Sequence, residues 1–187
     1  MTPSRRDAKI IREIRRVLRL ETATLVGLGR AVDARYAAAV RLLSRCSGKV
    51  LVTGVGKSGL IAQKIAATLS STGTPAVHMD PTDALHGGMG LVQKGDILIA
   101  VGKSGESDEL NALLPRLRAL GVKIVALTAN PRSTLARAAA LVLETPVKAE
   151  ACPLNLAPTC STTAALAAGD ALAVALMKVR GFDREHF

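Results

Sequence analysis

Residues 50–59 read Val-Leu-Val-Thr-Gly-Val-Gly-Lys-Ser-Gly, and residues 97–107 read Ile-Leu-Ile-Ala-Val-Gly-Lys-Ser-Gly-Glu-Ser. Each stretch begins with an apolar run typical of a strand buried on both faces, and each continues into the tetrapeptide Gly-Lys-Ser-Gly. Glycines at the end of a parallel strand let the backbone turn tightly and approach a ligand. Serine hydroxyls and free N–H groups at the start of the next helix suit a bound phosphate. The two loops together predict one site for an anionic small molecule.

Strands and helices are predicted to alternate along most of the chain. This alternation predicts an α/β fold, a three-layer α-β-α sandwich around a five-stranded parallel sheet with flavodoxin-like topology and a ligand at the carboxyl edge of the strands. The predicted strands are 49–53, 74–78, 96–101, 122–127 and 140–143, and the helices that follow them are 58–71, 82–86, 107–120, 133–139 and 161–180.

The N-terminal part is predicted to be helical. Residues 4–20 and 22–45 indicate one or two helices, with a break near Gly27 and Gly29. We expect residues 1–45 to pack as a helical region on a single globular domain of residues 46–187.

The composition excludes several classes of protein. Hydrophobic residues make up 49% of the 187 residues, which is too many for a disordered chain. We find no apolar run long enough to span a bilayer and no signal peptide, so we expect no membrane partner. The three cysteines form no CxxC pair, which is typical of a reducing compartment. We therefore expect a cytoplasmic protein.

The net charge of +10 comes mainly from residues 1–45, which hold eleven Lys or Arg against four Asp or Glu. Such a segment could be an arm that binds nucleic acid or a membrane, or the solvated face of an amphipathic helix. We favour the helix, because Ile10, Ile14, Val17 and Leu18 recur at helical spacing. Aromatic residues, which would stack on bases, are only 2% of the chain, so we expect no nucleic-acid partner.

The first glycine loop also fits two nucleotide-binding patterns in part. Residues 54–59 match GxGxxG, and Asp80 lies where a dinucleotide-binding fold places its ribose-binding acid. The same loop contains the Gly-Lys-Ser of a Walker A motif, but that motif needs a further glycine where this chain has Leu51. A Rossmann fold needs only one such loop, so the second copy weakens the NAD interpretation.

Three further residues are candidates for chemistry at the predicted edge. Glu109 falls in the first turn of the helix after the second loop, and Glu150 lies in a loop after the last strand, where a carboxylate could serve as a general base or be a solvated loop acid. His86 lies between glycines and could be structural or catalytic. No two His or Cys residues have metal-ligand spacing, so we expect no metal and no cofactor.

Several of these segments together resemble the sugar isomerase (SIS) domain, in particular that of the D-arabinose-5-phosphate isomerases. The resemblance covers about residues 20–187 and is most specific over 148–176. Its pieces are Gly-Val-Gly-Lys-Ser-Gly (54–59), Ser-Thr-Gly-Thr-Pro (71–75), Ala-Leu-His-Gly (84–87), Ser-Gly-Glu-Ser (104–107), Lys-Ala-Glu-Ala-Cys-Pro-Leu-Asn-Leu-Ala-Pro-Thr (148–159) and Gly-Asp-Ala-Leu-Ala-Val-Ala-Leu (169–176).

The resemblance implies interconversion of D-arabinose 5-phosphate and D-ribulose 5-phosphate through an enediol, in the synthesis of the Kdo sugar of lipopolysaccharide. It also implies a homotetramer with sites at subunit contacts. Carried over by position, Lys57, Glu109 and Glu150 are the catalytic candidates, with either glutamate as the base and Lys57 as the electrostatic stabiliser. The implied substrate-binding residues are Ser58, Gly73, Thr74, His86, Ser104 and Ser107.

The sequence departs from the family pattern at four places. The family continues beyond Gly181-Phe182 into a Ser-His-Pro-Gly-Gly segment, whose His is thought catalytic, and into a pair of CBS domains, none of which this sequence contains. The family often has Asn where Lys103 stands, so only the first lysine is carried over, and His where Asp80 stands. A non-catalytic module that senses phosphosugars or sugar nucleotides is therefore the second hypothesis, and an NAD-binding domain the third.

Overall fold

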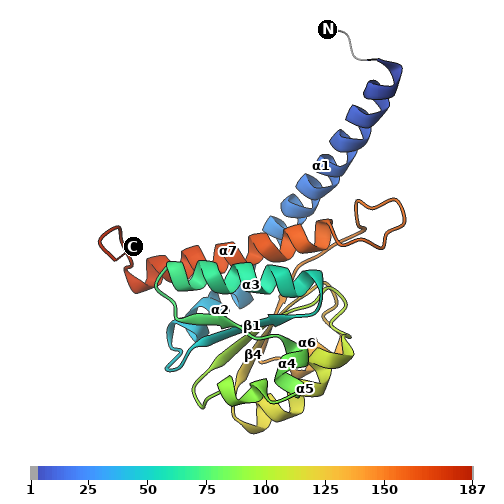
Figure 1. Cartoon of the computed structure of the whole chain (residues 1–187). Coiled ribbons are helices and arrows are strands. Elements are labelled where there is room, and N and C mark those ends of the chain that lie inside the picture. Colours follow the sequence, from blue (N-terminus) through green and yellow to red (C-terminus); the bar gives the residue numbers. More distant parts are fainter. Residues whose placement is uncertain (1–3, 187) are drawn as a thin grey trace.

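The computed structural model describes residues 4–186 and shows a parallel sheet with helices on both faces (Figure 1). The strands lie in the order β2-β1-β3-β4-β5, and every neighbouring pair is parallel. This is the flavodoxin-like order, so the predicted three-layer α/β fold is confirmed. The strands are β1 (Val50–Gly54), β2 (Ala76–His78), β3 (Ile97–Val101), β4 (Lys123–Thr128) and β5 (Leu141–Glu144).

Successive residues of the central strands face two separate apolar cores. Val52, Ile99 and Val125 belong to the core on one face, whereas Leu51 and Leu98 belong to the core on the other. Because both faces are covered, the strands are apolar at almost every position. One face carries α2 (Ala34–Ser44), α3 (Lys57–Ser71), α7 (Cys160–Arg180) and the end of α1 (Arg5–Ala31); the other carries α4 (Pro81–Leu85), the 3₁₀ turn η1 (Gly88–Leu91), α5 (Asp108–Ala119) and α6 (Thr134–Ala138).

The N-terminal helix α1 is continuous through Gly27 and Gly29, so the break predicted there is wrong. The chain turns instead at Val32 and Asp33, because the Asp33 carboxylate accepts the Arg35 N–H at 2.9 Å and begins α2. The first part of α1 projects away from the sheet, whereas its last turns approach α7 (Figure 1). The division of the chain at residue 45 stays a prediction.

The C-terminal helix α7 corrects one expectation. Over its 21 residues it is long and apolar enough, by length and composition, to span a membrane. In the fold, however, Ala164, Ala168, Leu172 and Leu176 pack into the core beside α3. The apolar composition of α7 is therefore explained by its burial, because α7 is a core helix of an α/β domain.

Candidate functional site

The two Gly-Lys-Ser-Gly loops leave the same edge of the sheet from neighbouring strands. Strands β1 and β3 are paired with Gly54 opposite Val101, and each loop begins directly after that pair. The chain then enters α3 on one face and α5 on the other. Ligands of open α/β sheets bind where consecutive connections diverge in this way. The structure therefore confirms that the two loops share one edge.

The first loop presents the N-terminus of α3. Gly56 has φ 58° and ψ −123°, a conformation that favours glycine, and it begins the helix with no side-chain cap. The first turn of this 15-residue helix is therefore open to an anion. Ser58 is half-buried in that turn. The Lys57 side chain is exposed, and it has no ion pair within residues 4–186.

Some polar groups of the second loop make hydrogen bonds that hold the loop and the next helix, whereas others stay available at the open edge. The Ser104 hydroxyl accepts the Glu106 N–H at 3.2 Å, and the Glu106 carboxylate accepts the Thr134 N–H at 3.0 Å, which caps the start of α6. Ser107 stands at the N-cap of α5, but its hydroxyl makes no capping bond. Glu109 is half-buried in the first turn of that helix. The hydroxyl of Ser107 is thus not committed to the helix that it begins.

Glu150 is buried at this edge and fully engaged. Its residue is only 4% exposed, and its Oε1 atom accepts a hydrogen bond from Lys103 Nζ at 2.7 Å. Its Oε2 atom accepts the Thr159 N–H at 2.9 Å, the Thr159 hydroxyl at 3.2 Å and the Ser161 N–H at 3.2 Å. Since Thr159 makes no side-chain bond to its own helix, Glu150 caps the first turn of α7.

These contacts set the charge of Glu150. Burial opposes the charged form and raises the pKa of the carboxyl, but the donors from Lys103, Ser161 and Thr159 outweigh burial and bring the pKa to about 2. The carboxylate is therefore ionised near neutral pH, and neither oxygen lacks a donor. A carboxylate in this state is a weak proton acceptor.

Gly73 and Thr74 lie at the opposite edge of the sheet. They precede β2 in the turn that follows α3, and the next carbonyl, of Pro75, accepts the N–H of Val50 at the start of β1 at 2.8 Å. A right-handed crossover must return to the amino ends of the strands, so this turn lies far along the strands from the two loops. One chain therefore does not bring these two residues to the site.

The remaining predicted residues fall around the α4 segment. His86 ends α4 with an exposed side chain, on the face that carries α5. Asp80 caps α4, since its carboxylate accepts the Thr82 N–H at 2.8 Å. Across residues 4–186, no group of three or more His, Cys, Asp or Glu side chains is arranged to hold a metal ion.

Comparison with known proteins gives the family. Residues 43–175 match the model of the SIS domain. The chain belongs to the SIS-domain family. Membership confirms the resemblance in the sequence and replaces the NAD-binding interpretation.

Relatives with curated names are arabinose 5-phosphate isomerases. This SIS chain is 48% identical to KdsD of Shigella flexneri over 171 residues, which is 91% of the chain and 52% of that relative. It is 45% identical to KdsD of Pseudomonas aeruginosa, over 95% of the chain and 54% of that relative. The chain thus spans about half the length of the curated relatives that it matches.

One similar solved structure matches nearly the whole chain. It is an Escherichia coli CFT073 protein in complex with arabinose 5-phosphate, with a TM-score of 0.93 and 40% sequence identity. The match covers 96% of this chain and 95% of that one. The SIS fold and its open edge are therefore shared at full length with a protein that binds a phosphosugar.

Proposed function

We propose that this SIS domain interconverts D-arabinose 5-phosphate and D-ribulose 5-phosphate through an enediol. The observation that carries the proposal is the full-length match to a protein solved with arabinose 5-phosphate, supported by the isomerase relatives. The two loops at one sheet edge suit a sugar phosphate. The reaction would supply the synthesis of the Kdo sugar of lipopolysaccharide, in the cytoplasm and without a cofactor.

We assign two roles to the residues of the open edge: some bind the phosphate, and two take part in the reaction. In the proposal, the N-terminus of α3 and three serine hydroxyls bind the phosphate. Glu109 moves the proton between C1 and C2, and Lys57 stabilises the oxyanion that develops on the neighbouring oxygen. Lys57 begins α3, which follows β1, and Glu109 lies in the first turn of α5, which follows the paired strand β3. The three serines are Ser58, Ser104 and Ser107.

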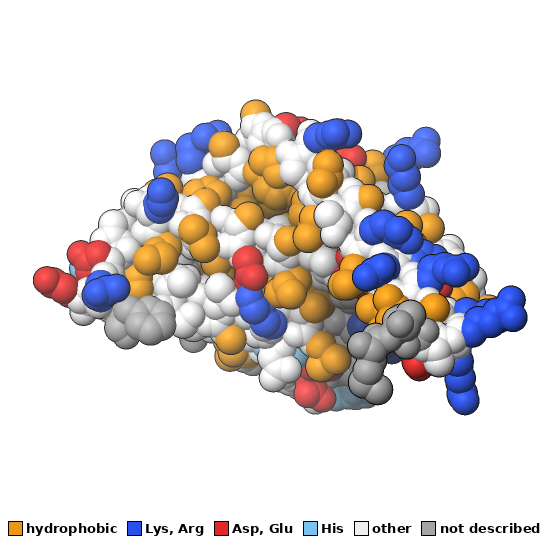
Figure 2. Space-filling model, turned by 90° about the horizontal axis from the view of Figure 1, so that it is seen from above, with side chains coloured by type: hydrophobic (Ala, Val, Ile, Leu, Met, Phe, Trp, Pro, Cys, Tyr) orange, Lys and Arg blue, Asp and Glu red, His pale blue; other side chains and the backbone are white. Residues whose placement is uncertain are grey.

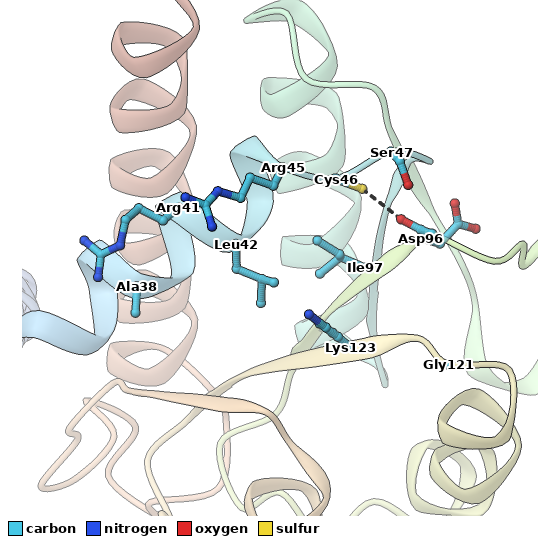
Figure 3. A pocket seen from close by; sticks show the side chains of 11 residues that line it. Ala38, Arg41, Leu42, Arg45, Cys46, Ser47, Asp96, Ile97, Gly121 and Lys123 are labelled. Atoms are coloured by element: carbon cyan, nitrogen blue, oxygen red, sulfur yellow. Dashed lines mark hydrogen bonds between the residues drawn. The ribbon is translucent and has the colours of Figure 1, made fainter.

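We further propose that the SIS chains assemble as a homotetramer that completes the site. Ile10, Ile14 and Leu18 are 52%, 55% and 58% exposed on α1, where they form an apolar stripe. Figure 2 shows hydrophobic side chains gathered on this side of the molecule, with Lys and Arg around them. Contacts between copies would cover the stripe and could bring Gly73 and Thr74 of one chain to the edge of another.

The test is direct turnover. The protein is incubated with arabinose 5-phosphate, and ribulose 5-phosphate is followed over time. Glu109→Gln should lower kcat by about 100-fold or more, because it removes the base. Asp108→Asn removes the same charge from the same helical turn and should keep most of the activity. Binding of the sugar phosphate without turnover would instead support the sensing module.

The proposed homotetramer is tested separately, by measuring the mass of the protein in solution. Light scattering should give the mass of four chains for the unaltered protein. Ile14→Asp places a charge in the apolar stripe and should yield smaller species, since a buried unpaired carboxylate opposes association. Asp7→Asn, at the start of the same helix, serves as a control that leaves the stripe intact. A monomeric unaltered protein would refute this part of the proposal.

A further inference from the structure

Lys103, the lysine of the second loop, is held by hydrogen bonds of both its backbone carbonyl and its side chain. Its carbonyl oxygen accepts the Ala129 N–H at 3.1 Å and the Thr128 hydroxyl at 3.1 Å, which ties the loop to the end of β4. Its ammonium donates to Glu150 at 2.7 Å. Lys103 therefore has a defined position at the open edge, whereas the side chain of Lys57 has no such anchor in the described part of the chain.

The two partners of this ion pair differ in their access to a ligand. The Glu150 side chain is 1% exposed, and the Lys103 side chain is 41% exposed. Both oxygens of Glu150 already accept hydrogen bonds, so a substrate finds no free atom on it. An ammonium group carries three donors, of which Glu150 takes one. The exposed partner of the pair is therefore the one that can meet a ligand.

The charge at this position suits the ligand class already proposed for the site. Lys103 directly precedes Ser104, in a loop whose glycines and hydroxyls suit a phosphate. A lysine whose ammonium is held in place loses less conformational freedom when it binds an anion than a free one does. Lys103 also follows β3, at the centre of the sheet, where the connections diverge.

We propose that Lys103 is a further substrate-binding residue that contacts the phosphate of the sugar phosphate, and that Glu150 is a positioning residue that acts through Lys103. The inference rests on the proposed function, because it takes the phosphosugar as the ligand. It assigns Glu150 a role in holding a cation and leaves the proton transfer to another carboxylate.

The experiment is a calorimetric titration with arabinose 5-phosphate and, separately, with inorganic phosphate, together with steady-state kinetics. Lys103→Met should raise the Kd of both ligands and the KM by about 10-fold or more, the effect of losing one charge-assisted hydrogen bond. Lys103→Arg should restore most of the affinity. Lys94→Met removes an exposed lysine before β3, at the opposite edge, and should change none of these values.

The role of Glu150 is tested by whether its substitution changes KM or kcat. A positioning role predicts that Glu150→Gln raises KM, that kcat falls by less than about threefold, and that the double variant with Lys103→Met is no worse than Lys103→Met alone. A fall in kcat of about 100-fold at unchanged KM would make Glu150 a proton-transfer group and overturn the inference. If Glu150→Gln does not fold, the Met and Arg variants of Lys103 decide the matter.

The outcomes also separate this inference from the proposed reaction. An unaltered protein that binds arabinose 5-phosphate without turning it over would refute the isomerase, while its titrations would still test Lys103. Equal affinities for the unaltered protein and Lys103→Met would overturn the inference even if turnover were normal. Binding of neither ligand by the unaltered protein would overturn both.

Discussion

The ring of Phe182, just beyond α7, lies directly against the α carbon of Gly73, in the turn between α3 and β2. A β carbon on Gly73 would overlap the ring, and the φ of 83° at this position favours glycine. The turn can therefore pack closely against the end of α7 only because residue 73 has no side chain. The resemblance implies a substrate-binding role for Gly73, and the single chain gives it a packing role.

Gly73→Ala should therefore lower the free energy of unfolding by about 2–4 kcal/mol, from backbone strain of about 1 kcal/mol plus overpacking. Gly121→Ala is the matched control, because Gly121 has a similar φ of 78° and no atom within 4 Å of the added carbon. It should cost only the strain. Urea unfolding measures both, and equal losses would show that the contact with Phe182 is unimportant.

Asp96, at the start of β3, should be the carboxylate whose loss costs the most stability. Its side chain is fully buried; it accepts the Lys49 ammonium at 2.8 Å and the N–H groups of Lys49 and Gln93 at 2.9 and 2.8 Å. Asp96→Ala leaves these donors unpaired and should cost about 3–5 kcal/mol in urea unfolding. Asp170→Ala breaks an exposed pair with Lys64 and should cost less than about 1 kcal/mol. Similar losses would contradict this ranking.

Much of the fold was predictable because local sequence patterns, such as apolar runs, identify its strands. The runs at 97–101 and 124–127 are apolar at every position, which only a strand covered on both faces requires. The break after α1 was misplaced because glycine lowers helix propensity by only about 1 kcal/mol, which the rest of a long helix can overcome. The signal that decides the break is Asp33, an N-cap residue for α2.

The site was predictable only as far as chain order determines it. Strand order and direction place Lys57, Ser104 and Glu109 at one edge, as expected. The contact between Lys103 and Glu150 joins residues 47 positions apart, and no local period or spacing encodes it. For that reason only the first lysine was carried over from the family pattern, and Glu150 was expected to be either a general base or a solvated loop acid.

Glu150 should also make the protein sensitive to acid. Its pKa falls from an ordinary 4.5 to about 2, so its contribution to stability is complete above the unfolded pKa and disappears as the pH falls through the folded one. The stability difference between the unaltered protein and Glu150→Gln should therefore shrink by about 3 kcal/mol between about pH 6 and pH 2. Urea unfolding at a series of pH values measures it. A difference independent of pH would show that folding does not change the pKa of Glu150.

Two glycines inside helices should respond to alanine with opposite signs. A β carbon on Gly169 of α7 would overlap Ile65 of α3, which is fully buried, whereas one on Gly27 of α1 meets no atom within 4 Å. Gly27→Ala should raise the free energy of unfolding by about 0.5–1 kcal/mol through helix propensity alone. Gly169→Ala gains the same propensity but forces α7 away from α3, and should lower stability by about 1–3 kcal/mol overall. Ile65→Val, which shortens the side chain that the new methyl group meets, should recover part of that loss in the double variant. Thermal unfolding of the unaltered protein and the four variants measures these effects. Additive effects of Gly169→Ala and Ile65→Val would show that the two helices are not in tight contact there.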